Sequence, residues 1–240
     1  MKVIPIKPAT SWSYSRYSDY RQCPLKFRLK HLDKIKEPGS EAMQRGTEIH
    51  DKAEAYIKGT TDVLDPRLGS FETELKAFRE QYKKKINGMV VEDTWAFTSN
   101  WDETSWDDWV HCWVRIKLDC AHHLEFNTMV VSDWKTGKIR QEMVEDYMEQ
   151  LELYALAALL LHEHIEAVIP RLCFTDQGEI YPRDPIVYVR SEMEDLKKKW
   201  TKRVKPMMTD TVFAPRPNDK CRWCFYRASN KTNGGGQCKY

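Results

Sequence analysis

The sequence lacks a hydrophobic run long enough to cross a membrane. Its longest apolar stretch, around residues 153–161, is far shorter than the roughly 20 residues that a membrane helix needs. The first residues include Lys2 and Lys7, but no apolar segment follows that would make them a signal peptide. We therefore expect a protein that has no membrane segment, is not secreted and works in the cytoplasm.

The chain also lacks a large net charge. Its 38 Lys and Arg residues stand against 36 Asp and Glu residues, which leaves a formal charge of +2. The distribution is uneven: residues 92–108 hold six acids and no base, whereas residues 215–240 hold six bases and one acid. A basic end on a nearly neutral chain fits either a local anionic partner or a solubilising tail.

The chain also lacks an even number of cysteines, which a complete set of disulfides would need. The chain has seven, and an odd count without a signal peptide argues against a disulfide framework and for a reducing compartment. Cys112 and Cys173 lie inside apolar runs and fit a hydrophobic core. The cysteines near the C-terminus need a different explanation.

Hydrophobic periodicity and capping residues divide the chain into helices and strands. We expect helices at 14–32 (broken or kinked by Pro24), 41–57, 65–86, 142–163 and 191–204, the last capped by Ser191. We expect strands at 89–97, 109–120, 128–135, 167–175 and 179–189, a turn at 125–127 and an acidic, Trp-rich hairpin loop or insertion at 99–108.

This order of elements predicts an α/β (mixed α+β) fold with a central mixed sheet flanked by helices. The length of 240 residues suits one domain over residues 1–240. We expect it to comprise an N-terminal helix (1–40), a core (41–205) and a cysteine-bearing tail (206–240).

Two carboxylates and a lysine are expected to meet at one edge of this sheet. Asp119 closes the predicted strand 109–120, and Asp133 lies near the end of the next strand along the chain, which is usually a neighbour in the sheet. Lys135 is two residues beyond Asp133 and so projects from the same face. Such a group suits a divalent cation and an activated water, although surface side chains at strand ends would give the same pattern.

Longer strings around these residues resemble the RecB-like branch of the PD-(D/E)XK nuclease superfamily. Residues 130–138 (VVSDWKTGK) are similar to its third motif, a strand that delivers Asp-x-Lys-Thr-Gly, and residues 116–119 (IKLD) to its second. Residues 45–50 (RGTEIH) resemble the Gly-Thr-x-x-His helix and residues 150–154 (QLELY) the Gln-x-x-x-Tyr motif. Ser13, Ser15 and the pair Cys23-Pro24 match the opening segment of the same enzymes.

The resemblance implies a PD-(D/E)XK core and a nuclease activity that depends on Mg²⁺ or Mn²⁺. It implies that the metal ligands are His50, Asp119, Asp133 and the backbone carbonyl of Trp134. It assigns Lys135 to the nucleophile, and Gln150 and Tyr154 to holding the DNA strand or Lys135. Glu92, on a predicted strand near the site, is a weaker candidate. Ile116 stands where these enzymes often have a glycine, and residues 99–108 have no counterpart.

The cysteines outside the predicted core follow a layout of one before it and three after it. Cys221 and Cys224 form a C-x-x-C, Cys238 follows after thirteen residues, and Cys23 precedes the core. This layout resembles the iron–sulfur staple of AddB-type nucleases, which implies a [4Fe–4S] cluster on these four residues. Thiolates also suit Zn²⁺, and unrelated free thiols are a further alternative. The staple would leave Arg222, Trp223 and Arg227, with Lys138 elsewhere, to contact DNA.

Several functions remain open at this point. The first is an exonuclease acting on DNA ends or single strands in recombination, repair or phage DNA processing, in a bacterial or phage-infected cell. The second is a structure-selective or nicking endonuclease, the third a catalytically inactive DNA-binding scaffold, and the fourth a zinc-stabilised adaptor. A helicase, a recombinase or another recombination protein is an expected partner. The histidine pairs His122-His123 and His162/His164 are expected at the surface or in the core rather than on a metal.

Overall fold

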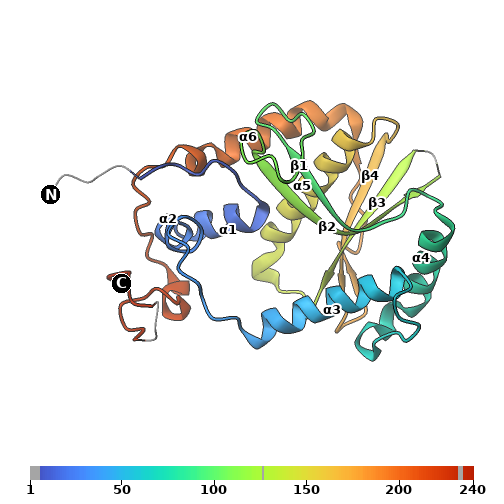
Figure 1. Cartoon of the computed structure of the whole chain (residues 1–240), viewed down its shortest axis with the longest axis horizontal. Coiled ribbons are helices and arrows are strands. Elements are labelled where there is room, and N and C mark those ends of the chain that lie inside the picture. The colour runs from blue at the N-terminus through green and yellow to red at the C-terminus, as the bar shows by residue number, and fades with distance from the viewer. Residues whose placement is uncertain (1–5, 126, 232–234) are drawn as a thin grey trace. The chain divides into compact units, whose positions relative to one another are not determined.

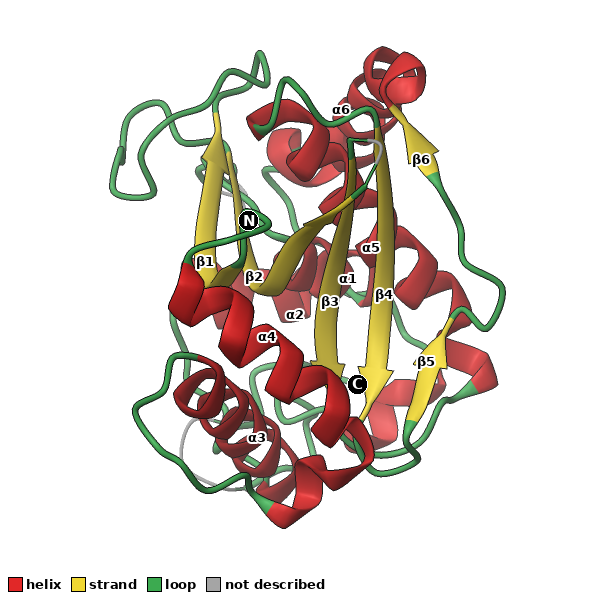
Figure 2. Ribbon diagram, turned by 90° about the vertical axis from the view of Figure 1, so that its right-hand side faces the viewer, coloured by secondary structure: helices red, strands yellow, loops and turns green. Residues whose placement is uncertain are grey.

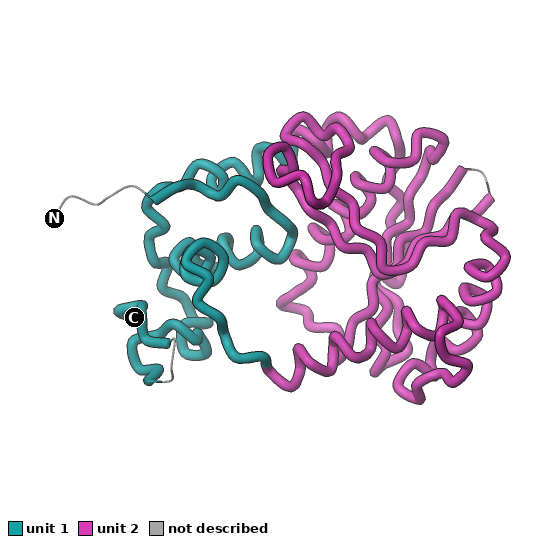
Figure 3. Tube along the Cα trace, viewed as in Figure 1, with its two compact units in different colours: residues 1–39, 199–240 teal, residues 40–198 magenta. Residues whose placement is uncertain are grey.

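The computed structural model describes residues 6–125, 127–231 and 235–240. The chain divides into two compact units, coloured separately in Figure 3. Unit 1 joins residues 1–39 to residues 199–240, and unit 2 holds residues 40–198. The expected turn at 125–127 includes Phe126, which lies outside the described residues. The single-domain division made from the sequence remains a prediction.

Unit 2 is built on a mixed sheet that has six strands within the described residues. The strands follow the order β1-β2-β3-β4-β5, and β6 pairs with the other end of β4. They are β1 (Val90–Phe97), β2 (Val114–Leu124), β3 (Thr128–Lys135), β4 (Ala167–Phe174), β5 (Glu179–Tyr181) and β6 (Tyr188–Val189). Only β3 and β4 pair in parallel, and the helix α5 (Val144–Leu161) is the crossover between them.

Helices cover both faces of this sheet, as Figures 1 and 2 show. The helices α3 (Glu41–Ile57) and α4 (Glu72–Lys84) pack on one face, in a core that includes Cys120, Trp134 and Cys173. The helix α5 packs on the other, where Leu151 meets Leu172 and Phe174. Residues 172, 173 and 174 alternate between the two cores, as the two-residue period of a strand requires. The expected mixed α/β fold is confirmed.

The ends of α3 are set by local chemistry. Ser40 caps its first turn by accepting a 3.2 Å hydrogen bond from the N–H of Met43, and Gly59 follows its end with a φ of +77°. Ile49, Ala53, Tyr56 and Ile57 are buried at helical spacing. The helix therefore occupies the residues that the sequence predicted, 41–57, and its apolar stripe fixes its rotation against the sheet.

The strand expected at 109–120 is displaced along the chain. The structure begins β2 at Val114 and ends it at Leu124, so Asp119 lies within the strand and does not close it. Residues 109–111 form a turn because Asp108 accepts hydrogen bonds from the N–H groups of Val110 and His111. Trp109 and Val110 are consequently exposed, at 79% and 83%. The hairpin loop expected at 99–108 is present and runs on into this turn.

Other boundaries also differ from the predictions. The single strand expected at 179–189 is interrupted between β5 and β6, where Pro182 and Pro185 offer no N–H to a ladder. The helix expected to end at Val204 is α6 (Met193–Thr209), and it continues through Pro206. Ser191 lies in a short 3₁₀ turn before α6 and does not cap it. Two other predicted helices open with 3₁₀ turns, Pro66–Phe71 before α4 and Gln141–Met143 before α5.

Unit 1 contains α1 (Tyr14–Gln22), α2 (Pro24–Phe27), a π-helical turn (Arg28–Leu32), the end of α6 and a 3₁₀ turn (Asp219–Trp223). The predicted break at Pro24 is confirmed, because Cys23 adopts an extended conformation between α1 and α2. Its core is aromatic: Trp12 stacks on Trp200, and Phe27 stacks on Phe213. Among the described residues of either unit, no helix has the length and apolar character to cross a membrane.

Candidate active site

The two carboxylates expected at the site lie where β2 and β3 separate. The last paired residues of this ladder are Cys120 and Ser132, and the next residues along the two strands are Asp119 and Asp133. The N–H of Trp134, released from the ladder, donates a 2.7 Å hydrogen bond to Oδ2 of Asp119. Both carboxylates are nonetheless buried, at 6% and 3% exposure. The opening between the strands therefore holds two acids in a water-poor environment.

Three ligand atoms gather on one side of this opening. His50 of α3, Glu92 of β1 and Asp119 of β2 each offer one atom, and these atoms lie within 4.8 Å of one another. The Nδ1 atom of His50 is 3.1 Å from Oδ1 of Asp119 and 3.9 Å from Oε1 of Glu92. One imidazole nitrogen and two carboxylates suit Mg²⁺ or Mn²⁺, so this group can hold a divalent metal ion.

Glu92 enters the group through an unusual backbone conformation. Its neighbours Val91 and Asp93 pair with Cys120 and Leu118, which places Glu92 opposite Asp119. Glu92 itself has a φ of +51°, in the left-handed region that non-glycine residues rarely adopt. Such strain often accompanies functional positions. The sequence named Glu92 only as a weaker candidate, because its position depends on strand register and on this local twist.

Asp133 is held from the other side by three side chains. Nζ of Lys135 lies 2.6 Å from its Oδ2, and the hydroxyl of Tyr154 donates a 2.8 Å hydrogen bond to its Oδ1. The amide of Gln150 donates to Oη of Tyr154 at 2.8 Å and to Oδ1 of Asp133 at 3.3 Å. The i, i+4 spacing on α5 places Gln150 and Tyr154 on one face, as the sequence predicted.

The structure thus brings together the expected side chains of His50, Asp119, Asp133, Lys135, Gln150 and Tyr154. Trp134 contributes its N–H through the bond to Asp119. Its carbonyl as a metal ligand remains a prediction, as do the individual roles of the side chains.

Burial and mutual repulsion shift the titration of the site. Burial raises the pKa of Asp119, and the charge of Asp133 raises it further. Burial alone would lower the pKa of His50, but the hydrogen bond and charge of Asp119 outweigh it and raise that pKa. The pKa of Lys135 is likewise raised, because Asp133 outweighs the effect of burial. The carboxylates therefore attract positive charge strongly, which is the electrostatic condition for binding a cation.

A second lysine approaches the group from the solvent side. Nζ of Lys117 lies 2.5 Å from Oε2 of Glu92, and its side chain is 63% exposed. The hydrogen bond to Glu92 raises the pKa of Lys117, so the amine carries its charge at neutral pH. Lys135, in contrast, is only 27% exposed. The site therefore has one sheltered lysine on Asp133 and one accessible lysine on Glu92.

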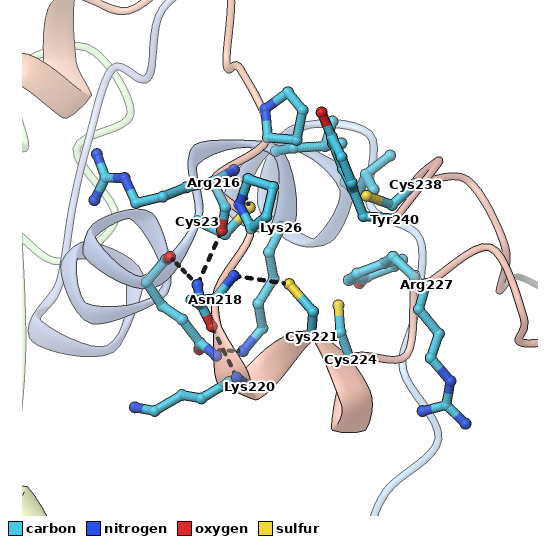
Figure 4. A pocket seen from close by; sticks show the side chains of 16 residues that line it. Cys23, Lys26, Arg216, Asn218, Lys220, Cys221, Cys224, Arg227, Cys238 and Tyr240 are labelled. Carbon is cyan, nitrogen blue, oxygen red and sulfur yellow. Dashed lines mark hydrogen bonds between the residues drawn. The ribbon is translucent and has the colours of Figure 1, made fainter.

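The four cysteines named from the sequence lie together in unit 1, around one pocket (Figure 4). Cys23, Cys221, Cys224 and Cys238 all line it and form no disulfide. The backbone N–H of Arg216 donates to Sγ of Cys23, and that of Asn218 to Sγ of Cys221, both at 3.3 Å. The second bond caps the 3₁₀ turn Asp219–Trp223, and hydrogen bonds to sulfur are also a feature of iron–sulfur ligands.

The active-site group stands apart from the cysteines. Within the described residues, His50, Glu92 and Asp119 are the one set of His, Cys, Asp or Glu side chains that offers three ligand atoms within 4.8 Å of one another. The four cysteines of the pocket do not form such a set.

The remaining expected residues have clear positions. Trp223 is 76% exposed, and the guanidinium group of Arg222 lies 5.3 Å from the centre of its ring. Arg227 donates to the carbonyl of Arg222. Lys138 is exposed on the turn after β3. Arg222, Trp223 and Lys138 are exposed, whereas Arg227 is half-buried and also donates to Oγ of Ser229; the contact of all four with DNA stays a prediction.

The histidine pairs expected at the surface or in the core lie on β2 and around the end of α5. His122 and His123 belong to β2, and His162 directly follows α5. His122 is buried against Phe78. His123, His162 and His164 form a cluster with ring centres 5.0 to 6.2 Å apart. None of them belongs to the metal-binding group defined above.

Comparison with known proteins agrees with this fold. A family model described as the PD-(D/E)XK nuclease superfamily matches residues 11–229. The match spans both units and all the active-site residues described above, so the chain belongs to the PD-(D/E)XK nuclease superfamily.

Individual proteins resemble this chain over a short part of its length or at low sequence identity. The Gene 69 protein of Mycobacterium phage L5 is 31% identical over 80 residues, which are 33% of this chain and 27% of that protein. The chain therefore matches about a quarter of this curated relative's length. Among solved structures, SSO0001 has a TM-score of 0.45 at 14% identity, over 91% of this chain and 84% of its own. A protein of Eubacterium rectale, named as a candidate exonuclease, has a TM-score of 0.48 at 12% identity, over 89% and 88%.

Proposed function

We propose that this nuclease is a Mg²⁺- or Mn²⁺-dependent deoxyribonuclease, acting as an exonuclease on DNA ends or single-stranded DNA. The observation that carries the proposal is the placement of Lys135 on Asp133, next to the ligand group of His50, Glu92 and Asp119. Phosphodiester hydrolysis needs an activated water and a counter-charge for the phosphate, and this arrangement offers both.

The side chains of the site divide this chemistry between them. A divalent ion held by His50, Glu92, Asp119 and Asp133 would lower the pKa of a bound water and neutralise the phosphate. Because Asp133 raises the pKa of Lys135, its amine is charged; it orients the attacking water and offsets the negative charge that develops on the phosphate. Tyr154 and Gln150 hold Asp133 by donating to its Oδ1, which leaves Oδ2 directed at Lys135.

The motif set supports an exonuclease, since its strings are those of RecB-like enzymes. A structure-selective or nicking endonuclease would use the same side chains. A catalytically inactive scaffold is less consistent with the site, because such a protein has no need for a half-buried lysine on a buried aspartate. Work in recombination, repair or phage DNA processing, beside a helicase or a recombinase, follows from the same resemblance.

The direct test is digestion of end-labelled linear, circular and single-stranded DNA with Mg²⁺ or Mn²⁺. The wild-type protein is compared with Lys135→Ala and with Lys198→Ala, a control on the exposed face of α6. We expect cleavage by the wild type and the control and a loss of at least 100-fold in Lys135→Ala. Products released from one labelled end, with circles resistant, would support an exonuclease. Cleavage of circular DNA would favour an endonuclease. If no substrate is cleaved, the proposed deoxyribonuclease activity is wrong.

For unit 1 we propose that Cys23, Cys221, Cys224 and Cys238 hold a [4Fe–4S] cluster. The layout of one cysteine before the core and three after it resembles the iron–sulfur staple of AddB-type nucleases, and all four cysteines line one pocket. Thiolates suit such a cluster, in which each cysteine binds a different corner. A zinc ion remains the alternative.

This proposal is tested by iron and zinc analysis of protein purified without oxygen. We expect about four iron atoms per chain and a brown colour, both lost in Cys221→Ser and retained in Cys112→Ser, a buried thiol outside the pocket. Stoichiometric zinc without iron would establish the alternative. Protein that is folded and free of both metals would contradict a metal centre.

We further propose that residues beside this pocket bind single-stranded DNA by stacking and charge. They are Arg222, Trp223 and Arg227, together with Lys138 elsewhere in the chain.

A further inference from the structure

The segment that follows β4 fastens the turn that follows β3. The N–H of Thr175 donates a 2.9 Å hydrogen bond to the carbonyl of Lys135. Asp176 accepts a 2.8 Å bond from the N–H of Gly137, and Gln177 accepts a 2.7 Å bond from the N–H of Ile139. Three successive residues of one segment thus bond to alternate residues of the other, directly after the lysine of the site.

The same aspartate is bound from α3. One guanidinium nitrogen of Arg45 donates to Oδ2 of Asp176 at 2.8 Å, and the other nitrogen contacts Oδ1, so the pair is bidentate. The hydrogen bonds from Arg45 are the largest cause of a lowered pKa at Asp176, with a further contribution from the N–H of Gly137. Asp176 is therefore ionised at neutral pH, and it ties two separate parts of unit 2 together.

Those two parts carry the two halves of the candidate active site. Arg45 is on α3, which also presents His50, and Gly137 follows the strand that presents Asp133 and Lys135. The helix passes close to the turn, since a side chain at Gly46 would lie 3.9 Å from Oγ1 of Thr136. Without Asp176, the N–H of Gly137 and the guanidinium group of Arg45 would bond to water instead, and this link between α3 and the turn would be lost.

We infer that Asp176 is a positioning residue for the metal centre, and this inference rests on the proposed function. It does not touch the ligand group, and it acts by fixing α3 to the end of β3. None of the motifs that define the site includes residue 176. The competing interpretation is an ordinary surface ion pair, which contributes about 0–1 kcal/mol to stability and nothing to activity.

Residues that orient metal ligands typically change metal affinity or activity by about 10- to 100-fold when they are mutated. We expect Asp176→Ala to lower kcat on DNA within that range. We also expect it to weaken Mn²⁺ binding in the absence of DNA, measured by the electron paramagnetic resonance signal of unbound Mn²⁺. Asp176→Asn keeps an acceptor for the N–H of Gly137 but loses the charge that binds Arg45, so we expect an intermediate effect. A change in stability alone would not weaken Mn²⁺ binding to the folded protein.

The matched control is Arg183→Ala, which removes an exposed ion pair to Glu179 in the same unit. We expect it to leave kcat and Mn²⁺ affinity unchanged. If Asp176→Ala is folded and retains wild-type kcat and Mn²⁺ affinity, the positioning role is wrong while the nuclease stands. If Asp176→Ala does not fold, Arg45→Gln provides the test, since it leaves the bond from Gly137 intact and should show the weakened Mn²⁺ binding. If the wild type cleaves no DNA, the proposed function fails, and Mn²⁺ binding still decides the role of Asp176.

Discussion

The hydroxyl of Tyr154 donates a 2.8 Å hydrogen bond to Oδ1 of Asp133, although both groups are buried. This bond presents the carboxylate in one orientation and leaves its other oxygen to Lys135. Burial raises the pKa of Tyr154 well above its usual range, and the charge of Asp133 raises it further, so the phenol remains a donor at any working pH.

Tyr154→Phe therefore removes a single donor without changing the shape of α5. A hydrogen bond to a charged group contributes about 1.5–3 kcal/mol. We expect kcat at saturating Mg²⁺ to fall by about 10- to 100-fold, since 1.4 kcal/mol corresponds to a factor of ten. Tyr82→Phe, a partly buried tyrosine packed in the other core of unit 2, serves as the control and should be unaffected. Wild-type kcat in Tyr154→Phe would show that Gln150 alone can hold Asp133.

Lys117 should oppose the binding of a metal ion, because its amine already neutralises Glu92. Two charges on a divalent ion and one on an amine repel each other by roughly 1–2 kcal/mol at a separation of about 5 Å in water. We expect Lys117→Met to bind Mn²⁺ roughly three- to tenfold more tightly at low ionic strength, and less so in salt, measured by Mn²⁺ titration. Unchanged or weaker binding would mean that Glu92 does not reach the ion.

His122 should make unit 2 sensitive to mild acid. Burial lowers its pKa from 6.5 to about 4, and the nearby charge of Arg171 adds to the effect. Because His122 resists protonation in the folded state, the unfolded state binds more protons below pH 6.5. The neutral histidine therefore does not reduce the free energy of unfolding above that pH, and the loss begins as the pH falls below it. We expect up to about 3 kcal/mol to be lost as the pH falls from 6.5 to 4.

The measurement is urea unfolding at several pH values between 7.5 and 4.5. His122→Gln cannot titrate, so its stability should fall less over this interval than that of the wild type. His111→Gln, at an exposed position in the hairpin loop, should keep the wild-type slope. Equal slopes for the wild type and His122→Gln would show that this histidine is protonated without cost in the folded state.

Gly88 should tolerate no side chain. Its φ of +51° lies in the left-handed region, and a Cβ there would lie 2.7–3.0 Å from three ring atoms of His123. We expect Gly88→Ala to lower the free energy of unfolding by about 1–3 kcal/mol. Gly69→Ala is the matched change, because a Cβ at Gly69 meets nothing within 4 Å, and it should be neutral or slightly stabilising. Equal thermal melting of the two variants would contradict the expected clash.

The sequence predicted elements best where both ends carry a chemical signal. The helix 41–57 has a serine cap and a following glycine, and the strand 128–135 is ended by Thr136-Gly137, so both predictions match the structure residue for residue. The strand expected at 109–120 was wrong because an alternation of apolar residues continued into a turn that Asp108 closes. Local side-chain bonds of this kind override periodicity.

The predicted end of helix α6 was wrong in the other direction, because the helix is longer than the sequence indicated. Proline usually ends a helix, yet Trp200, Val204 and Met207 are buried on one side of α6 and carry it past Pro206. The site itself was largely predictable, because Asp133, Lys135, Gln150 and Tyr154 sit at fixed spacings within single elements. Glu92 was predicted only as a weaker candidate and Asp176 not at all, since each depends on a register or turn contact between segments that are distant in the chain.

Unit 1 is assembled from the two ends of the described chain, and this affects the order in which the protein can be completed. Cys23 leaves the ribosome before any strand of the sheet, whereas Cys221, Cys224 and Cys238 leave after all of it. The sheet of unit 2 can therefore fold after Cys23 has been made and before the other three cysteines of unit 1 have been made. A translation product that ends before Cys221 would keep the candidate active site but lack the pocket of four thiols, so the pocket depends on residues that are made after the whole sheet.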